Sequence, residues 1–297
     1  MNVTHLRHVA LVAPEFERST KFFIEAWGLE CVERRNDSAF FRTALGEPYQ
    51  LELQAGPRRA VARIAFGLPA PADVDAAARE LEAAGIEIVQ KPGAIAGPGG
   101  GYGLRLRDPD GRCIELSAGV TLPGPSPQLA KPAFLSHIVL NTPQLDRMTD
   151  FFTTLLGFRV SDWSEHVMSF LRCNPEHHSV AFNAAPHASY NHTSWELPSI
   201  DELFRAQGRV RSHGTQLSWG TGRHAPGKQV FNYFVEPSGY VVEYIADGER
   251  IDDEASWQVQ VHGRTPAAMD LWNTAGPPSP EIRAAMLGEP DLATAAR

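Results

Sequence analysis

The chain has 297 residues, which is enough for two domains with cores of ordinary size. Its 43% hydrophobic and 21% charged residues are typical of a folded globular protein, and its formal net charge of −8 argues against nucleic-acid binding, which needs a basic surface. No apolar run reaches the roughly 20 residues of a membrane helix, no signal-peptide pattern stands at the N-terminus, and the three cysteines lie far apart. We therefore expect a cytoplasmic protein without disulfides or a cysteine-based zinc site.

The beginning and the end of each half of the chain follow the same patterns, which indicates an internal repeat. Residues 6–30 predict a strand, a turn that contains proline, and a helix with paired phenylalanines that ends at a glycine. Residues 135–159 repeat this order, and Gly157 stands where a helix-capping glycine is expected. Each half closes with a predicted β-hairpin, at 101–119 and at 230–248, in which a turn with proline and glycine joins two apolar strands.

The middle of each half matches as well. Residues 63–69 (RIAFGLP) align with 192–198 (HTSWELP), and helix patterns follow at 73–84 and 200–207. Each half therefore consists of two strand–helix–hairpin modules, and the predicted fold class is α+β with two tandem domains.

A proline-rich segment separates the two halves. The sequence TLPGPSPQLAKP at 121–132 is predicted to be a linker. We expect one domain at 1–120, a second at 133–250, and a C-terminal extension at 251–297 that is partly irregular.

The histidines are distributed unevenly, and this points to a site in the second half. Nine of the eleven lie from His137 onward. His137 and Glu243 each stand within an apolar strand pattern, where an ionised carboxylate must be paired, protonated or bound to a metal. His192 shares an alternating strand face with other polar residues. Each of the three alone is more often a hydrogen-bonded structural residue, but two histidines and a carboxylate from separate strands form a metal-ligand set that leaves open positions on Fe(II).

These residues lie in segments that resemble the type I extradiol (catechol meta-cleaving) dioxygenases of the vicinal oxygen chelate superfamily. The segments are SHI at 136–138, HHS at 177–179, NHT at 191–193 and GRHAPGKQVFNYFVEPSGYVVEY at 222–244. The last is the most specific, since it matches the family pattern G-R-H, Y, P-x-G and E-Y in order. The superfamily resemblance extends over roughly residues 5–250, and the catalytic match over about 134–250. It implies paired βαβββ modules in each domain, whose sheets curl into an open barrel around the metal.

The resemblance also implies roles for individual residues. The metal ligands would be His137, His192 and Glu243, holding Fe(II), although the same set would hold Mn(II). His178 resembles the catalytic acid–base histidine beside the bound O2, with His177 as the competitor because an HH pair alone does not show which ring faces inward. The remaining substrate contacts would come from His224 and Tyr233. The implied partners are a small catechol and O2, and the implied assembly is a homo-oligomer.

The first half departs from the metal-binding pattern. His8 and Glu115 stand at the repeat positions of His137 and Glu243, but Arg63 stands at the position of His192. A permanent cation opposes metal binding and could instead pair with Glu115. We therefore expect the N-terminal domain to be metal-free.

Two other functions are compatible with the same fold. The superfamily includes glyoxalase-, epimerase- and fosfomycin-resistance-type metalloenzymes that do not use O2, and these lack the set His178, His224 and Tyr233. It also includes non-catalytic binding proteins of the bleomycin-resistance kind, which usually lack metal ligands.

Overall fold

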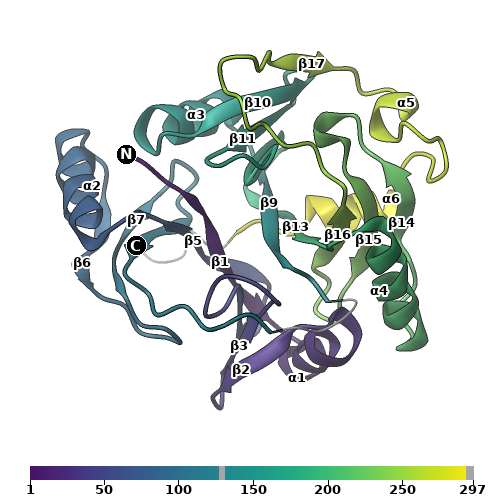
Figure 1. Ribbon diagram of the computed structural model, residues 1–297, viewed down its shortest axis with the longest axis horizontal. Coiled ribbons are helices and arrows are strands. Elements are labelled where there is room, and N and C mark those ends of the chain that lie inside the picture. Colours follow the sequence, from purple (N-terminus) through teal and green to yellow (C-terminus); the bar gives the residue numbers. More distant parts are fainter. Residues whose placement is uncertain (127–130, 292–297) are drawn as a thin grey trace.

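A computed structural model describes residues 1–126 and 131–291 of the chain. The predicted linker, 121–132, therefore lies partly outside the described residues, as does the end of the predicted extension. Each half of the chain forms one mixed β-sheet, and the two sheets lie side by side, with the earlier elements in purple and blue and the later ones in green and yellow (Figure 1). None of the helices among the described residues is long and apolar enough to cross a membrane.

The first half contains an eight-stranded sheet in the order β2-β3-β4-β1-β5-β8-β7-β6. Its strands are β1 (His5–Ala13), β2 (Glu30–Arg34), β3 (Ser38–Arg42), β4 (Leu51–Ala55), β5 (Ala60–Gly67), β6 (Ile88–Ala94), β7 (Tyr102–Arg107) and β8 (Cys113–Ala118). Its helices are α1 (Phe16–Lys21), which continues as a π-helical turn at Phe22–Trp27, and α2 (Pro71–Ala83).

The second half contains a nine-stranded sheet in the order β14-β15-β16-β13-β9-β12-β11-β10-β17. Its strands are β9 (Phe134–Thr142), β10 (Arg159–Ser164), β11 (Met168–Arg172), β12 (Val180–Ala184), β13 (Ser189–Glu196), β14 (Trp219–Arg223), β15 (Val230–Val235), β16 (Val241–Ala246) and β17 (Gln260–His262). Its helices are α3 (Leu145–Asp150), which continues as a π-helical turn at Phe151–Leu155, α4 (Ile200–Ser212), a 3-10 turn at Pro226–Lys228, α5 (Pro266–Met269) and α6 (Pro280–Leu287).

Each sheet is built from two βαβββ modules that join through their first strands. In the first half β1 pairs with β5, and in the second half β9 pairs with β13, both antiparallel. The prediction of an α+β fold with paired βαβββ modules is confirmed. Two local features differ from expectation: the C-terminal extension adds β17 to the edge of the second sheet, and the helix predicted at 200–207 extends to Ser212. Its buried face continues through Val210 beyond Gly208, so packing outweighs the cost of about 1 kcal/mol that an internal glycine carries.

The strand registers of the two halves are equivalent. Arg63 lies opposite the residue two positions after His8. His192 lies opposite the residue two positions after His137. Arg63 therefore occupies the place in the first sheet that His192 occupies in the second, as the alignment of the two halves predicts.

Aromatic packing joins the two halves. The ring of Trp27, from the first half, stacks on the ring of Tyr244 on β16 with centroids 3.7 Å apart. Tyr244 Oη donates to the carbonyl oxygen of Trp27 at 2.5 Å, and Arg209 on α4 donates to the same oxygen at 2.9 Å. Both rings are fully buried in one apolar core that runs through both halves.

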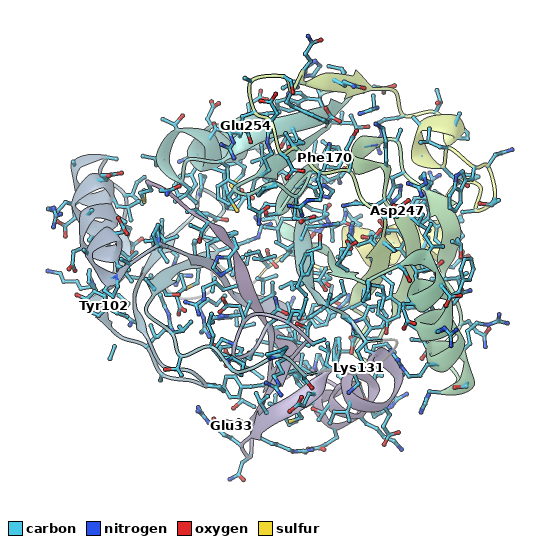
Figure 2. All side chains as sticks on the ribbon, viewed as in Figure 1. Glu33, Tyr102, Lys131, Phe170, Asp247 and Glu254 are labelled. Atoms are coloured by element: carbon cyan, nitrogen blue, oxygen red, sulfur yellow. The ribbon has the colours of Figure 1, made fainter. Side chains whose placement is uncertain are left out.

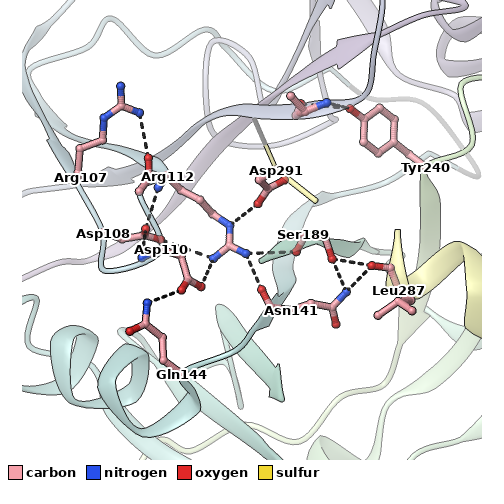
Figure 3. Close-up of polar contacts among 12 residues, drawn as sticks. Arg107, Asp108, Asp110, Arg112, Asn141, Gln144, Ser189, Tyr240, Leu287 and Asp291 are labelled. Atoms are coloured by element: carbon pink, nitrogen blue, oxygen red, sulfur yellow. Dashed lines mark hydrogen bonds and ion pairs between the residues drawn. The ribbon is translucent and has the colours of Figure 1, made fainter. Parts of the chain in front are cut away.

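A buried arginine forms a second junction, drawn in Figure 3. Arg112, just before β8, has a side chain that is 1% exposed. Its guanidinium lies 2.9 Å from Asp110 and 2.7 Å from Asp291 near the C-terminal end, and it donates to the carbonyl oxygen of Asn141 on β9 at 2.5 Å. One side chain thus connects the first half, the second half and the C-terminal extension.

Candidate metal centre

Three neighbouring strands of the second sheet bring the predicted ligands together. His137 lies on β9, His192 on β13 and Glu243 on β16. One ligand atom from each lies within 4.8 Å of the other two, and all three residues are buried. Glu243 Oε2 is 3.3 Å from His137 Nε2 and 3.5 Å from His192 Nε2. The sheet order β16-β13-β9 therefore converts three distant positions in the sequence into one cluster.

The environment of Glu243 fits a metal ion. It is 1% exposed, and neither carboxylate oxygen has a hydrogen bond from any described residue. Burial alone would raise the pKa of Glu243, but the neighbouring His137 and His192 hold it well below its usual value. Burial lowers the pKa of His137 to about 4. An ionised carboxylate beside a neutral imidazole is the protonation state that a divalent metal requires.

A side chain next to His192 orients this candidate ligand. His192 Nδ1 donates to the side-chain oxygen of Asn191 at 2.7 Å, which leaves the lone pair on Nε2 facing Glu243. Asn191 in turn donates to Asn141 Oδ1 at 3.0 Å. Asn191 belongs to the NHT segment, but its role beside His192 becomes apparent only when both side chains are located.

The HH pair at 177 and 178 separates in the structure. His178 lines the cavity, and its ring lies 4.0 Å from the ring of His137 and 5.1 Å from Phe170, which is labelled in Figure 2. Burial lowers the pKa of His178 well below its usual value. His177 is fully buried and turns toward Asp162 on β10. The two rings therefore point in different directions, and His178 is the one that faces the site, as the family pattern implies.

His224 lies near the other carboxylate oxygen of Glu243, Oε1, and Tyr233 lies beside His224. His224 Nδ1 donates to the carbonyl oxygen of Met269 at 2.8 Å, and His224 Nε2 lies within hydrogen-bond distance of Tyr233 Oη, at 3.1 Å. His224 Nε2 is also 3.5 Å from Glu243 Oε1, and the His224 ring stacks on Phe231 at 3.9 Å. Burial, with the nearby charge of Glu243, raises the pKa of Tyr233 well above its usual value, which keeps the phenol protonated as a donor.

All six predicted site residues line one cavity of about 390 Å³. Apolar side chains such as Val139 and Phe170 form part of its wall. The C-terminal extension forms another part, which the sequence analysis did not assign to the site: Arg264, Ala268, Met269, Pro278, Arg283, Met286 and Leu287. The proline-rich pattern of this extension gave no signal for its position, because its contacts are with strands far away in the sequence.

The equivalent place in the first half holds a guanidinium. Arg63 Nη2 is 2.6 Å from Glu52 Oε2, and Arg63 Nε is 3.2 Å from Glu115 Oε2. Glu115 also pairs with Arg105 at 2.9 Å, and His8 lies 3.3 Å from Arg63 Nε. The carboxylates are thus neutralised by arginines, and Arg63 pairs with Glu115 as its position suggested.

Comparisons with known proteins agree with this architecture. Residues 5–116 and 134–244 each match the Glyoxalase/Bleomycin resistance protein/Dioxygenase superfamily. The chain is 27% identical over 281 residues to metapyrocatechase 2 of Cupriavidus necator, covering 86% of this chain and 84% of the relative. It is 30% identical over 232 residues to 2,2',3-trihydroxybiphenyl dioxygenase of Sphingomonas paucimobilis, covering 72% of this chain and 78% of the relative.

Two solved structures are similar over nearly the whole chain. A Mn(II)-bound glyoxalase from Novosphingobium aromaticivorans has a TM-score of 0.90 and 35% identity, with 95% of this chain and 94% of that chain covered. BphC, a halotolerant catechol dioxygenase, has a TM-score of 0.81 and 25% identity, with 94% and 96% covered. The chain therefore belongs to the Glyoxalase/Bleomycin resistance protein/Dioxygenase superfamily, and within it to the type I extradiol dioxygenases.

Proposed function

We propose that this chain is an extradiol dioxygenase that opens the ring of a catechol-type substrate and inserts both atoms of O2. The proposed ligands of its Fe(II) are His137, His192 and Glu243. The observation that carries the proposal is that His178 and the pair His224–Tyr233 surround this ligand set in one cavity. The resemblance implies that the superfamily enzymes that do not use O2 lack this set of residues.

The ligand chemistry and the relatives limit the proposed metal to Fe(II) or Mn(II). Two imidazoles and one carboxylate suit Fe(II) and Mn(II) alike. One relative is a manganese-dependent 2,3-dihydroxybiphenyl 1,2-dioxygenase and another is an iron-dependent extradiol dioxygenase. Fe(II) is our first choice and Mn(II) the second. When bound, the metal would supply the redox chemistry by which O2 reacts with an aromatic diol.

The side chains of this protein bind the substrate and move its protons. The ring would pack against the apolar wall at Val139 and Phe170, with its two hydroxyls toward Glu243. His178 is proposed to take a hydroxyl proton and later return it to the product oxygen. Tyr233 and His224 are proposed to hydrogen-bond the other substrate oxygen and to stabilise the charge that develops there.

The outcome of this arrangement is cleavage next to the two hydroxylated carbons, not between them. The expected product is a ring-opened semialdehyde, which is yellow because it is a conjugated enolate. Each turnover consumes one catechol and one O2. A homo-oligomer in the cytoplasm is part of the same proposal, and light scattering of the purified protein would measure its size.

The test is an oxygen-uptake assay. The protein is loaded with Fe(II) without air, mixed with a panel of substituted catechols, and then exposed to O2. We expect equal amounts of O2 consumed and yellow product formed. His137→Gln should abolish the activity, whereas His8→Gln, at the equivalent position of the first half, should preserve most of it. Full iron occupancy without O2 uptake on any catechol would refute the proposal.

One observation favours a second candidate function. The structural relative with 35% identity is a Mn(II)-bound glyoxalase. An enzyme of that class would act with Mn(II) and would consume no O2. Incubation of the Mn(II)-loaded protein with methylglyoxal and glutathione under nitrogen distinguishes the two, since only a glyoxalase would convert the hemithioacetal that they form into a thioester.

A further inference from the structure

Four polar side chains form a continuous row from the cavity to the edge of the second sheet. His178 Nδ1 lies 3.0 Å from His177 Nδ1. His177 Nε2 lies 3.1 Å from Asp162 Oδ2, and the same oxygen lies 2.8 Å from His262 Nε2 on β17. His177 is 0% exposed and Asp162 is 2% exposed, whereas the His262 side chain is 16% exposed. The row therefore begins at the proposed acid–base group and ends near solvent.

The C-terminal extension fixes the position of Asp162. Strand β17 pairs with β10, so that Gln260 lies opposite Asp162, and the Gln260 backbone N–H donates to Asp162 Oδ1 at 2.8 Å. Trp257 Nε1 donates to the carbonyl oxygen of Ser161 at 2.8 Å, and the Trp257 ring contacts the His177 ring. Without the extension, Asp162 would lose two of its three hydrogen-bond donors.

The carboxylate of Asp162 determines where the protons in this row must lie. Burial would raise the pKa of Asp162, but hydrogen bonds from His177, Gln260 and His262 hold it below its usual value. An ionised carboxylate only accepts, so His177 must carry its proton on Nε2. The Nδ1 atom of a neutral His177 is then an acceptor, and His178 must donate to it from Nδ1.

We propose that Asp162 and His177 are positioning residues that fix His178 in the tautomer with its proton on Nδ1. This inference rests on the proposed function, in which His178 takes a proton from the substrate. In that tautomer the lone pair is on Nε2, which has no hydrogen bond from any described residue and belongs to a ring that lines the cavity. In other enzymes a carboxylate holds a catalytic histidine in one tautomer by a direct hydrogen bond. Here His177 lies between the carboxylate of Asp162 and the proposed acid–base group His178.

The tautomer can be measured without any turnover. The full chain, labelled with 15N and loaded with diamagnetic Zn(II), which takes the same kinds of ligand, is studied by long-range 1H–15N NMR of its imidazoles. We expect His178 to show a protonated Nδ1 and an unprotonated Nε2. A proton on Nε2 of His178 would overturn the proposal. If the tautomer is as expected and no catechol is cleaved, the proposed function fails while this inference stands.

Two variants separate positioning from folding. Asp162→Asn leaves one acceptor oxygen for three donors, so His177 Nε2 is no longer required to donate and His178 should become a mixture of tautomers. We expect kcat to fall about 10- to 100-fold, within the usual contribution of acid–base catalysis, with KM and metal content unchanged. Glu254→Gln is the matched control, because Glu254 anchors the same segment through Arg172 at 2.5 Å without touching the histidines. It should leave both the tautomer and kcat unchanged, and an equal loss in both variants would show that only docking of the extension matters.

Discussion

Replacing Arg112 with methionine tests whether one buried guanidinium couples the two halves of the molecule. The group is 1% exposed and lies within 2.9 Å of Asp110 and 2.7 Å of Asp291, while it also donates to Asn141 (Figure 3). Methionine keeps an unbranched apolar chain but supplies no donor. The buried carboxylate of Asp291 would then lose its ion pair, the carbonyl oxygen of Asn141 would lose this donor, and Asp110 would keep only the hydrogen bond from Gln144.

The expected loss of stability follows from this burial. Removing one partner of a buried ion pair costs about 3–5 kcal/mol, because the remaining charge is uncompensated. We therefore expect Arg112→Met to lower the free energy of unfolding by about 3–5 kcal/mol. Arg205→Met is the matched control: Arg205 pairs with Asp201 at 2.8 Å, but its side chain is 63% exposed, so the change should stay below about 1 kcal/mol.

The assay is urea unfolding followed by tryptophan fluorescence, with a chelator present so that metal binding does not contribute. Burial raises the pKa of Asp108, which pairs with Arg112 at 3.7 Å, to about 6. At pH 5 this carboxyl is largely protonated in the folded protein, so the loss caused by Arg112→Met should be smaller at pH 5 than at pH 8. A loss at pH 8 no larger than that of the Arg205 variant would refute a coupling role for the guanidinium.

Three further predictions concern the metal sites and pH. Mn(II) at 100 times its Kd should stabilise the wild type and the variant His8→Gln by about 2.7 kcal/mol in urea unfolding, and should not stabilise His137→Gln. Arg63→His places an imidazole beside Glu115 in the first half, so metal analysis should find about two equivalents per chain, and a single equivalent would contradict the inferred equivalence of the halves. Burial, with neighbouring carboxylates, raises the pKa of Glu196 from 4.5 to about 8. Between pH 4.5 and about pH 8, the carboxyl of Glu196 is protonated in the folded protein and ionised in the unfolded protein, so the free energy of unfolding should fall as pH rises. The stability of Glu196→Gln relative to wild type should therefore grow from pH 5 to pH 8, by at most about 1.4 kcal/mol per pH unit.

Much of the architecture could be predicted because the chain repeats itself. The alignment of 6–30 with 135–159 locates both modules of each half, and the strand register then makes Arg63 equivalent to His192. The proposed ligands His137 and Glu243 were visible because a charged or titratable side chain in an apolar strand demands a partner. These inferences depend on short-range patterns, which the sequence carries directly.

The rest of the site depends on contacts that no local pattern encodes. Asp162 lies in an ordinary strand sequence, and its role becomes apparent only because β17 places His262 against it, 100 residues later. The cavity wall at Met269 lies in the same extension and was predicted only as partly irregular chain. The HH pair was ambiguous for a related reason, since the direction of each ring depends on which neighbour, Asp162 or His137, it meets.

The stack of Trp27 on Tyr244 has a consequence for how the two halves share stability. Tyr244 directly follows Glu243, so the strand that supplies a proposed ligand is packed against the half that has none. Any ion that binds only the folded second half must therefore also oppose unfolding of the first, by thermodynamic linkage. The two halves should unfold as one cooperative unit, and the repeat that carries Arg63 would act as a scaffold for the repeat with the proposed metal site.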